Sequence, residues 1–103
     1  MRFLMKVSIP VEAGNKAVKA GKLGTTIQSI LAEMKPEAAY FSAEKGMRGG
    51  YIFLELADAS QIPAVAEPWF LAFNATVEIM PVMLPADLAQ AAPAIKKAAK
   101  TYG

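Results

Sequence analysis

EKGMRGGYIFLEL, residues 44–56, joins a glycine-rich turn to a stretch in which aromatic and aliphatic residues alternate. Alternation with a period of two predicts a strand over Tyr51–Leu56, and the preceding residues Ala38–Glu44 have a second strand pattern. Gly46 followed by Met47 suits a type II′ turn, because the leading glycine adopts positive φ. The stretch therefore predicts a β-hairpin in the middle of the chain.

The hairpin is flanked on both sides by a strand and a helix. Prolines and glycines give the limits of these elements, because proline cannot continue a strand ladder or a helix interior. Thr25 to Gln28 has the spacing of a helix capping box, and Ser60 is the expected N-cap of the next helix. The expected outer strands cover 2–9 and 76–83, and Pro81 ends the second of these or places it at an edge. The expected helical segments cover 11–20 and 25–34, with a short helix over 60–73 that Pro68 kinks. A last helix begins at Leu84 and is divided by Pro93.

The order of these elements is β-α-β-β-α-β followed by a C-terminal helix. This order is typical of a ferredoxin-like α+β fold. We therefore predict one domain over residues 1–103, with an antiparallel sheet in the strand order 4-1-3-2 and both main helices on one face.

The composition limits the kinds of function that are available. Apolar residues make up 54% of the chain and charged residues only 19%, which is an apolar excess for a small monomer and favours a second copy as partner. A net charge of +2 is too small to indicate nucleic-acid binding. The chain has no cysteine and no histidine, so thiolate, Cys-ligated and His-based chemistry are excluded. We expect no metal and no cofactor.

The N-terminal residues MRFLMKVSIP lack an uninterrupted apolar segment, since Lys6 falls inside it. No run of the sequence approaches the roughly 20 apolar residues that a membrane helix needs. We therefore expect a cytoplasmic protein with no membrane partner.

Strand periodicity places several polar side chains on the sheet face opposite the helices. Lys6 lies on this outer face, and we expect Glu78 and Glu55 on its two sides. A carboxylate there is a candidate base, with Lys6 adjusting its charge and Tyr40 or Tyr51 donating a hydrogen bond. The alternative is a structural ion cluster, because opposite charges across strands commonly stabilise a sheet.

Two further features have both a functional and a structural interpretation. Arg48, before Gly49 and Gly50, offers a guanidinium to an anionic ligand, but the glycines also suit a turn that leads into a strand. Trp69, near Phe70 and Phe73, is a candidate wall of a ligand pocket and an equally suitable core residue. We treat Tyr40, Arg48, Tyr51 and Trp69 as candidate ligand-binding residues.

GYIFLEL, from Gly50, partly imitates the strand 3 motif of RNA-recognition domains, with Tyr51 and Phe53 at the base-stacking positions. Gly49 stands where that motif has a basic residue, and Ile52 stands where it has a small one. Glu55 and Glu78 place negative charge on the same face. RNA binding is therefore the third of the functional alternatives.

Four segments, KPEAAYF (35–41), RGGYIF (48–53), AEPWFLAFNA (66–75) and PVMLPADL (81–88), together resemble small uncharacterised bacterial proteins of the dimeric α+β barrel superfamily. That superfamily includes muconolactone isomerases, cofactor-independent monooxygenases, chlorite dismutase-like haem proteins and stress-responsive barrels. The resemblance implies a homodimer with a pocket between sheet and helices. The histidines that those enzymes commonly use are absent here, which argues against haem.

The leading functional hypothesis is a homodimeric barrel that binds a small, partly apolar organic molecule, either neutral or anionic. If the protein is an enzyme, cofactor-free isomerisation, proton transfer or monooxygenase-like chemistry is expected, with Glu55 or Glu78 as base. The alternative is a non-catalytic structural or sensing dimer.

Overall fold

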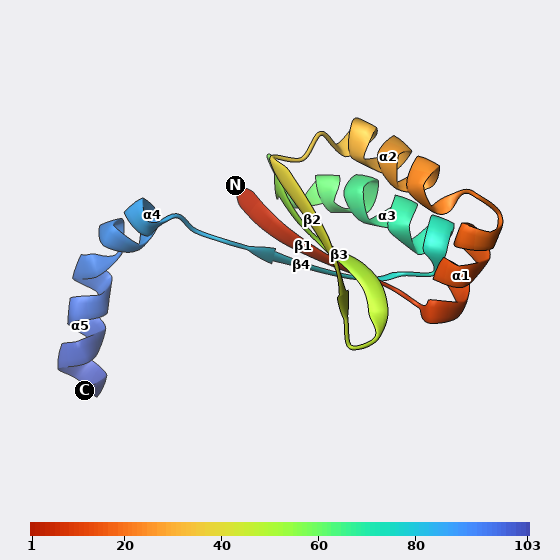
Figure 1. Cartoon of the computed structure of the whole chain (residues 1–103). Helices are drawn as coiled ribbons and strands as arrows, with labels where there is room; N and C mark the ends of the chain where they lie inside the picture. Colours follow the sequence, from red (N-terminus) through yellow and green to blue (C-terminus); the bar gives the residue numbers. More distant parts are fainter.

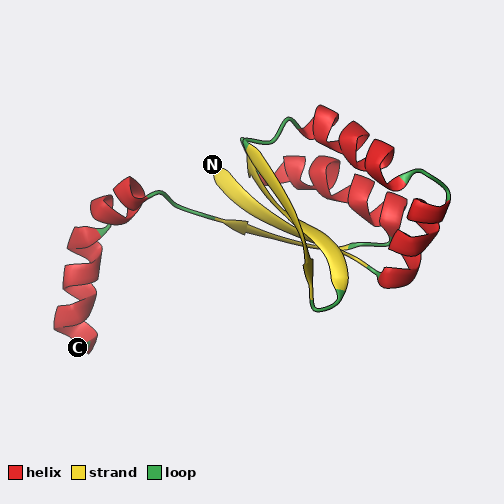
Figure 2. Cartoon of the chain, in the orientation of Figure 1, coloured by secondary structure: helices red, strands yellow, loops and turns green.

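The computed structural model describes residues 1–103 and contains a four-stranded antiparallel sheet with helices on one face and a helical extension at the C-terminus (Figures 1 and 2). The sheet order β2-β3-β1-β4 is the predicted order 4-1-3-2, so the predicted ferredoxin-like fold is confirmed. The elements are β1 (Arg2–Ile9), α1 (Val11–Lys19), α2 (Leu23–Met34), β2 (Ala38–Glu44), β3 (Met47–Glu55), η1 (Ala59–Gln61), α3 (Ile62–Phe73), β4 (Thr76–Pro81), α4 (Pro85–Gln90) and α5 (Ala92–Tyr102).

The core lies between the sheet and the helices α2 and α3. Trp69 and Phe73 of α3 and Ile30 of α2 pack on the apolar side chains that alternate along β1 and β3. Burying each large apolar side chain contributes roughly 1.5–3 kcal/mol relative to exposure. The buried apolar side chains that alternate along β1 and β3 on this face are Met5, Val7, Ile9, Ile52 and Leu54.

The hairpin turn differs from the prediction by one residue. Its central residues are Lys45 and Gly46, with φ of 53° and 77°, and positive φ at both positions is typical of a type I′ turn. The type II′ turn at Gly46 and Met47 is therefore wrong. The I′ twist matches that of the flanking strands, so β3 already begins at Met47 and Arg48 lies in the strand.

The shift of the turn by one residue also changes the pairing of β2 with β3. Tyr40 lies opposite Tyr51, whereas the expected turn would have placed it opposite Phe53. Because this register shift is an even number of residues, every side chain keeps its predicted face.

Two helix starts also differ from the prediction. Helix α2 begins at Leu23, and the Thr25 hydroxyl, inside its first turn, donates to the Lys22 carbonyl at 3.3 Å instead of forming a capping box. Before α3, the cap is Asp58, whose carboxylate accepts from the backbone N–H of Ser60 at 2.9 Å. Asp58 thus satisfies a free backbone N–H at the start of η1, the short turn that leads into α3, whereas α2 has no side-chain cap.

The prolines of the second half occupy positions that proline tolerates, apart from Pro68. Pro81 ends β4 as predicted. The C-terminal helix divides at Ala91, and Pro93 lies in the first turn of α5, where its missing N–H has no partner to lose. Helix α3 runs from Ile62 to Phe73 through Pro68. No helix of the structure has the length and apolarity that a bilayer span requires.

Candidate functional site

A cleft of about 320 Å³ opens between α2 and the hairpin end of the sheet, on the helix-covered side. This volume is at the lower end of the range of roughly 300–1,000 Å³ that is typical of small-molecule sites. Its walls come from one residue of β1, two of α2, two of β2 and two of β3, namely Ile9, Leu23, Ile27, Phe41, Ser42, Arg48 and Gly49. Apolar walls with a single cation are suited to a partly apolar anion.

Arg48 supplies the only charge in the cleft. The alternation of β3 turns its side chain toward the helices, and its Nη1 donates to the side-chain oxygen of Asn15 in α1 at 3.0 Å. No carboxylate forms an ion pair with Arg48. The ion pairs of the structure join Met1 to Glu55, Arg2 to Glu37 and Lys6 to Glu44. The Arg48 charge is therefore available to an anion.

Gly14 makes room for this guanidinium. It is buried in α1, and a Cβ at this position would lie 2.7 Å from Arg48 Nη1 and 3.4 Å from Arg48 Cδ. Gly14 was not among the candidate site residues predicted from the sequence. The sequence signal that could have identified it is a glycine inside a helical pattern. Alanine is more stable at such a position, so a glycine there commonly indicates a close contact.

Gly50 has a similar role for the wall on β2. It lies opposite Phe41 in the β2–β3 register, and a Cβ there would come within 2.8 Å of the Phe41 ring. The missing side chain thus lets the ring lie over the strand beside the cleft. Gly50 therefore lies within β3 and allows Phe41 to pack on the strand. It is not part of a turn, which was one interpretation of Arg48-Gly49-Gly50 from the sequence.

The outer face of the sheet holds a separate polar network. Lys6 Nζ lies 2.5 Å from a carboxylate oxygen of Glu44, and the Tyr51 hydroxyl donates to the other oxygen. Lys6 also lies 5.8 Å from the centre of the Tyr51 ring. Glu78 is opposite Lys6 on β4, as predicted. Glu44 was missed because the expected turn at Gly46 and Met47 would have placed it opposite Gly49, whereas in the structure it lies opposite Met47 and pairs with Lys6.

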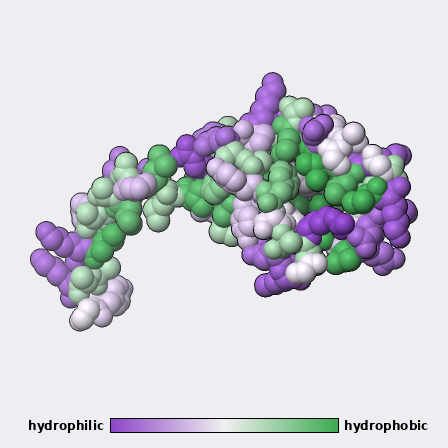
Figure 3. Space-filling model, viewed as in Figure 1, coloured by the Kyte–Doolittle hydropathy of each residue, from purple (hydrophilic) through white to green (hydrophobic).

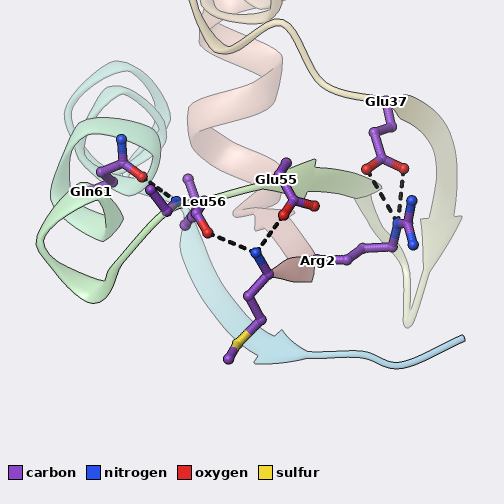
Figure 4. A network of polar contacts seen from close by, with 7 residues as sticks. Arg2, Glu37, Glu55, Leu56 and Gln61 are labelled. Atoms are coloured by element: carbon purple, nitrogen blue, oxygen red, sulfur yellow. Dashed lines mark hydrogen bonds and ion pairs between the residues drawn. The ribbon is translucent and has the colours of Figure 1, made fainter. Parts of the chain in front are cut away.

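Glu55 does not flank Lys6, so this part of the prediction is wrong. The β1–β3 register places Tyr51 opposite Lys6 and Glu55 opposite Arg2. Figure 4 shows that Glu55 faces the N-terminal amino group, which also donates to the Leu56 carbonyl at 3.1 Å. Arg2 pairs instead with Glu37 at 2.9 Å. The register, which strand periodicity alone does not give, decides this pairing.

The outer network fixes the charge of its members. The hydrogen bond with Glu44 raises the pKa of Lys6. The bonds from Lys6 and then Tyr51 lower the pKa of Glu44. Donating to Glu44 raises the pKa of the Tyr51 hydroxyl. At neutral pH Glu44 therefore stays ionised and paired, which is typical of a structural network and leaves Glu78 as the carboxylate without an ion-pair partner.

The other predicted ligand-binding residues lie outside the cleft. Trp69 is fully buried in the core with its ring centre 6.2 Å from that of Phe73, and its indole N–H has no hydrogen-bond partner. Tyr40 is 64% exposed on β2, on the same outer face as Tyr51. Of the four candidates, the structure brings only Arg48 into the cleft.

A larger depression, of about 770 Å³, lies between α1, the start of α2 and the end of α3. Its charged lining residues, Glu12, Lys16 and Lys22, are all exposed. Arg48, in contrast, is half-buried against α1. The smaller cleft is therefore the better candidate site. The structure brings together no group of three or more acidic side chains that could hold a metal ion.

A model of the family described as Domain of unknown function (DUF3303) matches residues 1–96. The chain belongs to this family. No curated protein matches it. The DUF3303 match reaches into α5, so it covers the whole sheet, the cleft, α4 and the first five residues of α5.

Two solved structures have a similar fold. One is 5-chloro-2-hydroxyhydroquinone dehydrochlorinase (TftG) from Burkholderia phenoliruptrix AC1100 in complex with 2,5-dihydroxybenzoquinone, with a TM-score of 0.65, 13% identity and coverage of 84% of this chain and 98% of that chain. The other is a formyltetrahydrofolate deformylase from Pseudomonas putida KT2440, with a TM-score of 0.50, 15% identity and coverage of 80% of this chain and 29% of that chain. At these identities the likeness shows the α+β fold. The DUF3303 match confirms the predicted membership of a family of proteins of unknown function.

Proposed function

We propose that the protein is a homodimer in which each protomer binds a small, partly apolar organic anion in the cleft at Arg48. The observation that carries this proposal is a guanidinium without an acidic partner among apolar walls. Guanidinium groups bind carboxylates through two parallel hydrogen bonds, and exclusion of water by apolar walls strengthens such bonds. The cleft volume favours a ligand of about one ring.

Benzoate is a suitable first probe because it combines one apolar ring with one carboxylate, and benzamide is its neutral counterpart. We expect calorimetry to detect saturable benzoate binding and an at least tenfold weaker affinity for benzamide. Arg48→Gln should remove this preference, since a charge-assisted hydrogen bond contributes about 1.5–3 kcal/mol. The matched control is Arg2→Gln, which removes the same type of side chain at the opposite end of β1 and should bind benzoate normally.

Two results would count against the proposal: no saturable binding by wild type, or equal benzoate affinity in wild type and Arg48→Gln. 2,5-Dihydroxybenzoquinone, the compound bound to the structurally similar TftG, is a second probe of similar size. Comparing its affinity with that of benzoate tests whether the cleft prefers a ring with oxygens on both sides to a ring with one carboxylate.

The homodimer part of the proposal rests on the uncovered outer face of the sheet. Leu4, Tyr51 and Phe53 are only half-buried there, and Tyr40 and Met80 are exposed. Contiguous apolar surface of this kind commonly marks an interaction site, and a second copy would close two sheets into a barrel. Sedimentation of the full chain should give twice the monomer mass at micromolar concentration.

A second candidate function is a structural or sensing dimer without a ligand. It is supported by the mutual pairing of Lys6, Glu44 and Tyr51, which leaves the network no free acceptor for a substrate proton. In this alternative, alanine at Glu55 and Glu78 changes the dimer dissociation constant, and none of the ring probes binds. Proton transfer by Glu78, with Lys6 beside it, would require a second copy to enclose the outer face.

A further inference from the structure

The C-terminal arm, residues 84–103, stands apart from the rest of the chain. Figures 1 and 2 show α4 and α5 extending beyond the end of β4, away from the sheet and its helices. The last backbone hydrogen bond to the body is the one from Val82 to the Arg2 carbonyl, at 3.0 Å. Within the arm only Ala91 is even half-buried.

The arm is at best marginally stable by itself in this position. Helix α4 has 6 residues and α5 has 11, and isolated helices shorter than about 12–15 residues are marginal in water. Helices of this length take most of their stability from packing an apolar face against other elements. The body of the same chain provides no such contact, so another surface must.

The arm has an apolar stripe for this packing. Leu88, Ile95 and Tyr102 recur at intervals of seven residues and are 51%, 54% and 87% exposed. The lysines Lys96, Lys97 and Lys100 fall between them in sequence. Figure 3 shows hydrophobic residues along the length of the arm and hydrophilic ones gathered at its outer side.

The amount of exposed surface is the amount that a second copy would cover. The chain exposes 7132 Å², whereas a compact chain of this mass exposes about 5,600 Å². Its radius of gyration is 17.4 Å, against about 13 Å for a compact domain of this length. The excess of about 1,500 Å² per chain is within the range that each subunit of an obligate dimer buries, about 1,000–2,500 Å².

The uncovered outer face of the sheet and the apolar stripe of the arm belong to the same chain. In a twofold dimer the arm of each protomer contacts the partner, and the partner's arm contacts the first protomer in return. Charge does not oppose this pairing, because the arm has three lysines and one aspartate, whereas the eight basic and eight acidic residues of residues 1–83 balance. We propose that α4 and α5 are an exchanged arm that packs the Leu88–Ile95–Tyr102 stripe on a second copy of this chain. This inference rests on the homodimer of the proposed function.

Sedimentation equilibrium of full-length variants tests the contribution of the stripe. Leu88→Ser with Ile95→Ser should weaken dimerisation at least about 100-fold, because two apolar side chains per arm lose their buried environment. The matched control, Lys96→Ser with Lys97→Ser, alters the polar side of α5 and should stay within about threefold of wild type. Equal dissociation constants for wild type and the stripe variant would overturn the exchanged arm while leaving the homodimer intact. A wild type that is monomeric at all concentrations would overturn the homodimer itself.

A cross-linking experiment separates exchange from folding back onto the same chain. The chain has no cysteine, so Lys100→Cys gives a single attachment point for a benzophenone on the polar side of α5. This light-isotope protein is equilibrated with a tenfold excess of ¹⁵N-labelled wild type and irradiated. Exchange predicts cross-links from the light arm to heavy peptides of residues 1–83. Cross-links to light peptides alone would show that the arm packs on its own chain.

Discussion

Gly14→Ala should separate the stability of the protein from its proposed binding activity. The added Cβ would lie 2.7 Å from Arg48 Nη1, so the guanidinium has to leave its place beside Asn15. Alanine is more stable than glycine in a helix interior by about 0.5–1 kcal/mol. The lost hydrogen bond to Asn15 costs a similar amount, about 0.5–1.5 kcal/mol. The free energy of unfolding should therefore stay within about 1 kcal/mol of the wild-type value.

Benzoate affinity should respond far more strongly. If the displaced guanidinium loses a charge-assisted hydrogen bond of about 1.5–3 kcal/mol, the dissociation constant rises roughly 10- to 100-fold. Chemical denaturation measures the first quantity and titration calorimetry the second.

Gly24→Ala is the matched control for this experiment. It makes the same change in α2, and its Cβ would meet no atom within 4 Å. It should leave benzoate binding unchanged. If Gly14→Ala binds benzoate as tightly as Gly24→Ala, Arg48 does not need the space above Gly14, and the proposed role of Gly14 is wrong.

Three further predictions concern the fold and the outer network. Lys45→Asn should stabilise the protein by about 0.5–1 kcal/mol in urea denaturation, because asparagine tolerates the positive φ that precedes Gly46; a loss of stability would contradict the type I′ turn. Ile52→Ala should cost about 2–5 kcal/mol, as expected for a fully buried side chain, and a cost below 1 kcal/mol would contradict the core described above. The lowered pKa of Glu44 stabilises the fold above its ordinary pKa of 4.5, and this contribution is lost as pH falls through the lowered value. Glu44→Gln should therefore flatten the acid limb of a Tm-against-pH curve, whereas Glu33→Gln, at an exposed position in α2, should not.

Much of the fold follows from local patterns in the sequence. Alternation in Arg2–Ile9 and Tyr51–Leu56 identifies strands and their buried faces, and the order of elements is sufficient for the sheet topology. The turn at Lys45 and Gly46 was misplaced because a lysine at positive φ has no sequence signature, while Gly46 fits either turn type. The error did not change the faces, since it moved the register by an even number of residues.

The site was harder to predict because it depends on contacts between distant segments. Arg48 was a candidate from its residue type, but its neighbours Gly14 and Asn15 come from a helix that precedes it by more than one element. The Lys6 network was expected with Glu55, and the register supplied Glu44 instead. Periodicity gives the face of a side chain, but the pairing of strands decides which charges on that face meet.

The most direct test of the central claim is a crystal structure of the protein with 4-bromobenzoate, whose bromine can be located by anomalous scattering. We predict a bromine peak among Leu23, Ile27 and Phe41, with the carboxylate oxygens about 2.7–2.9 Å from the Arg48 guanidinium. A cleft without the compound, or an Arg48 side chain paired with a carboxylate of the protein itself, would contradict it.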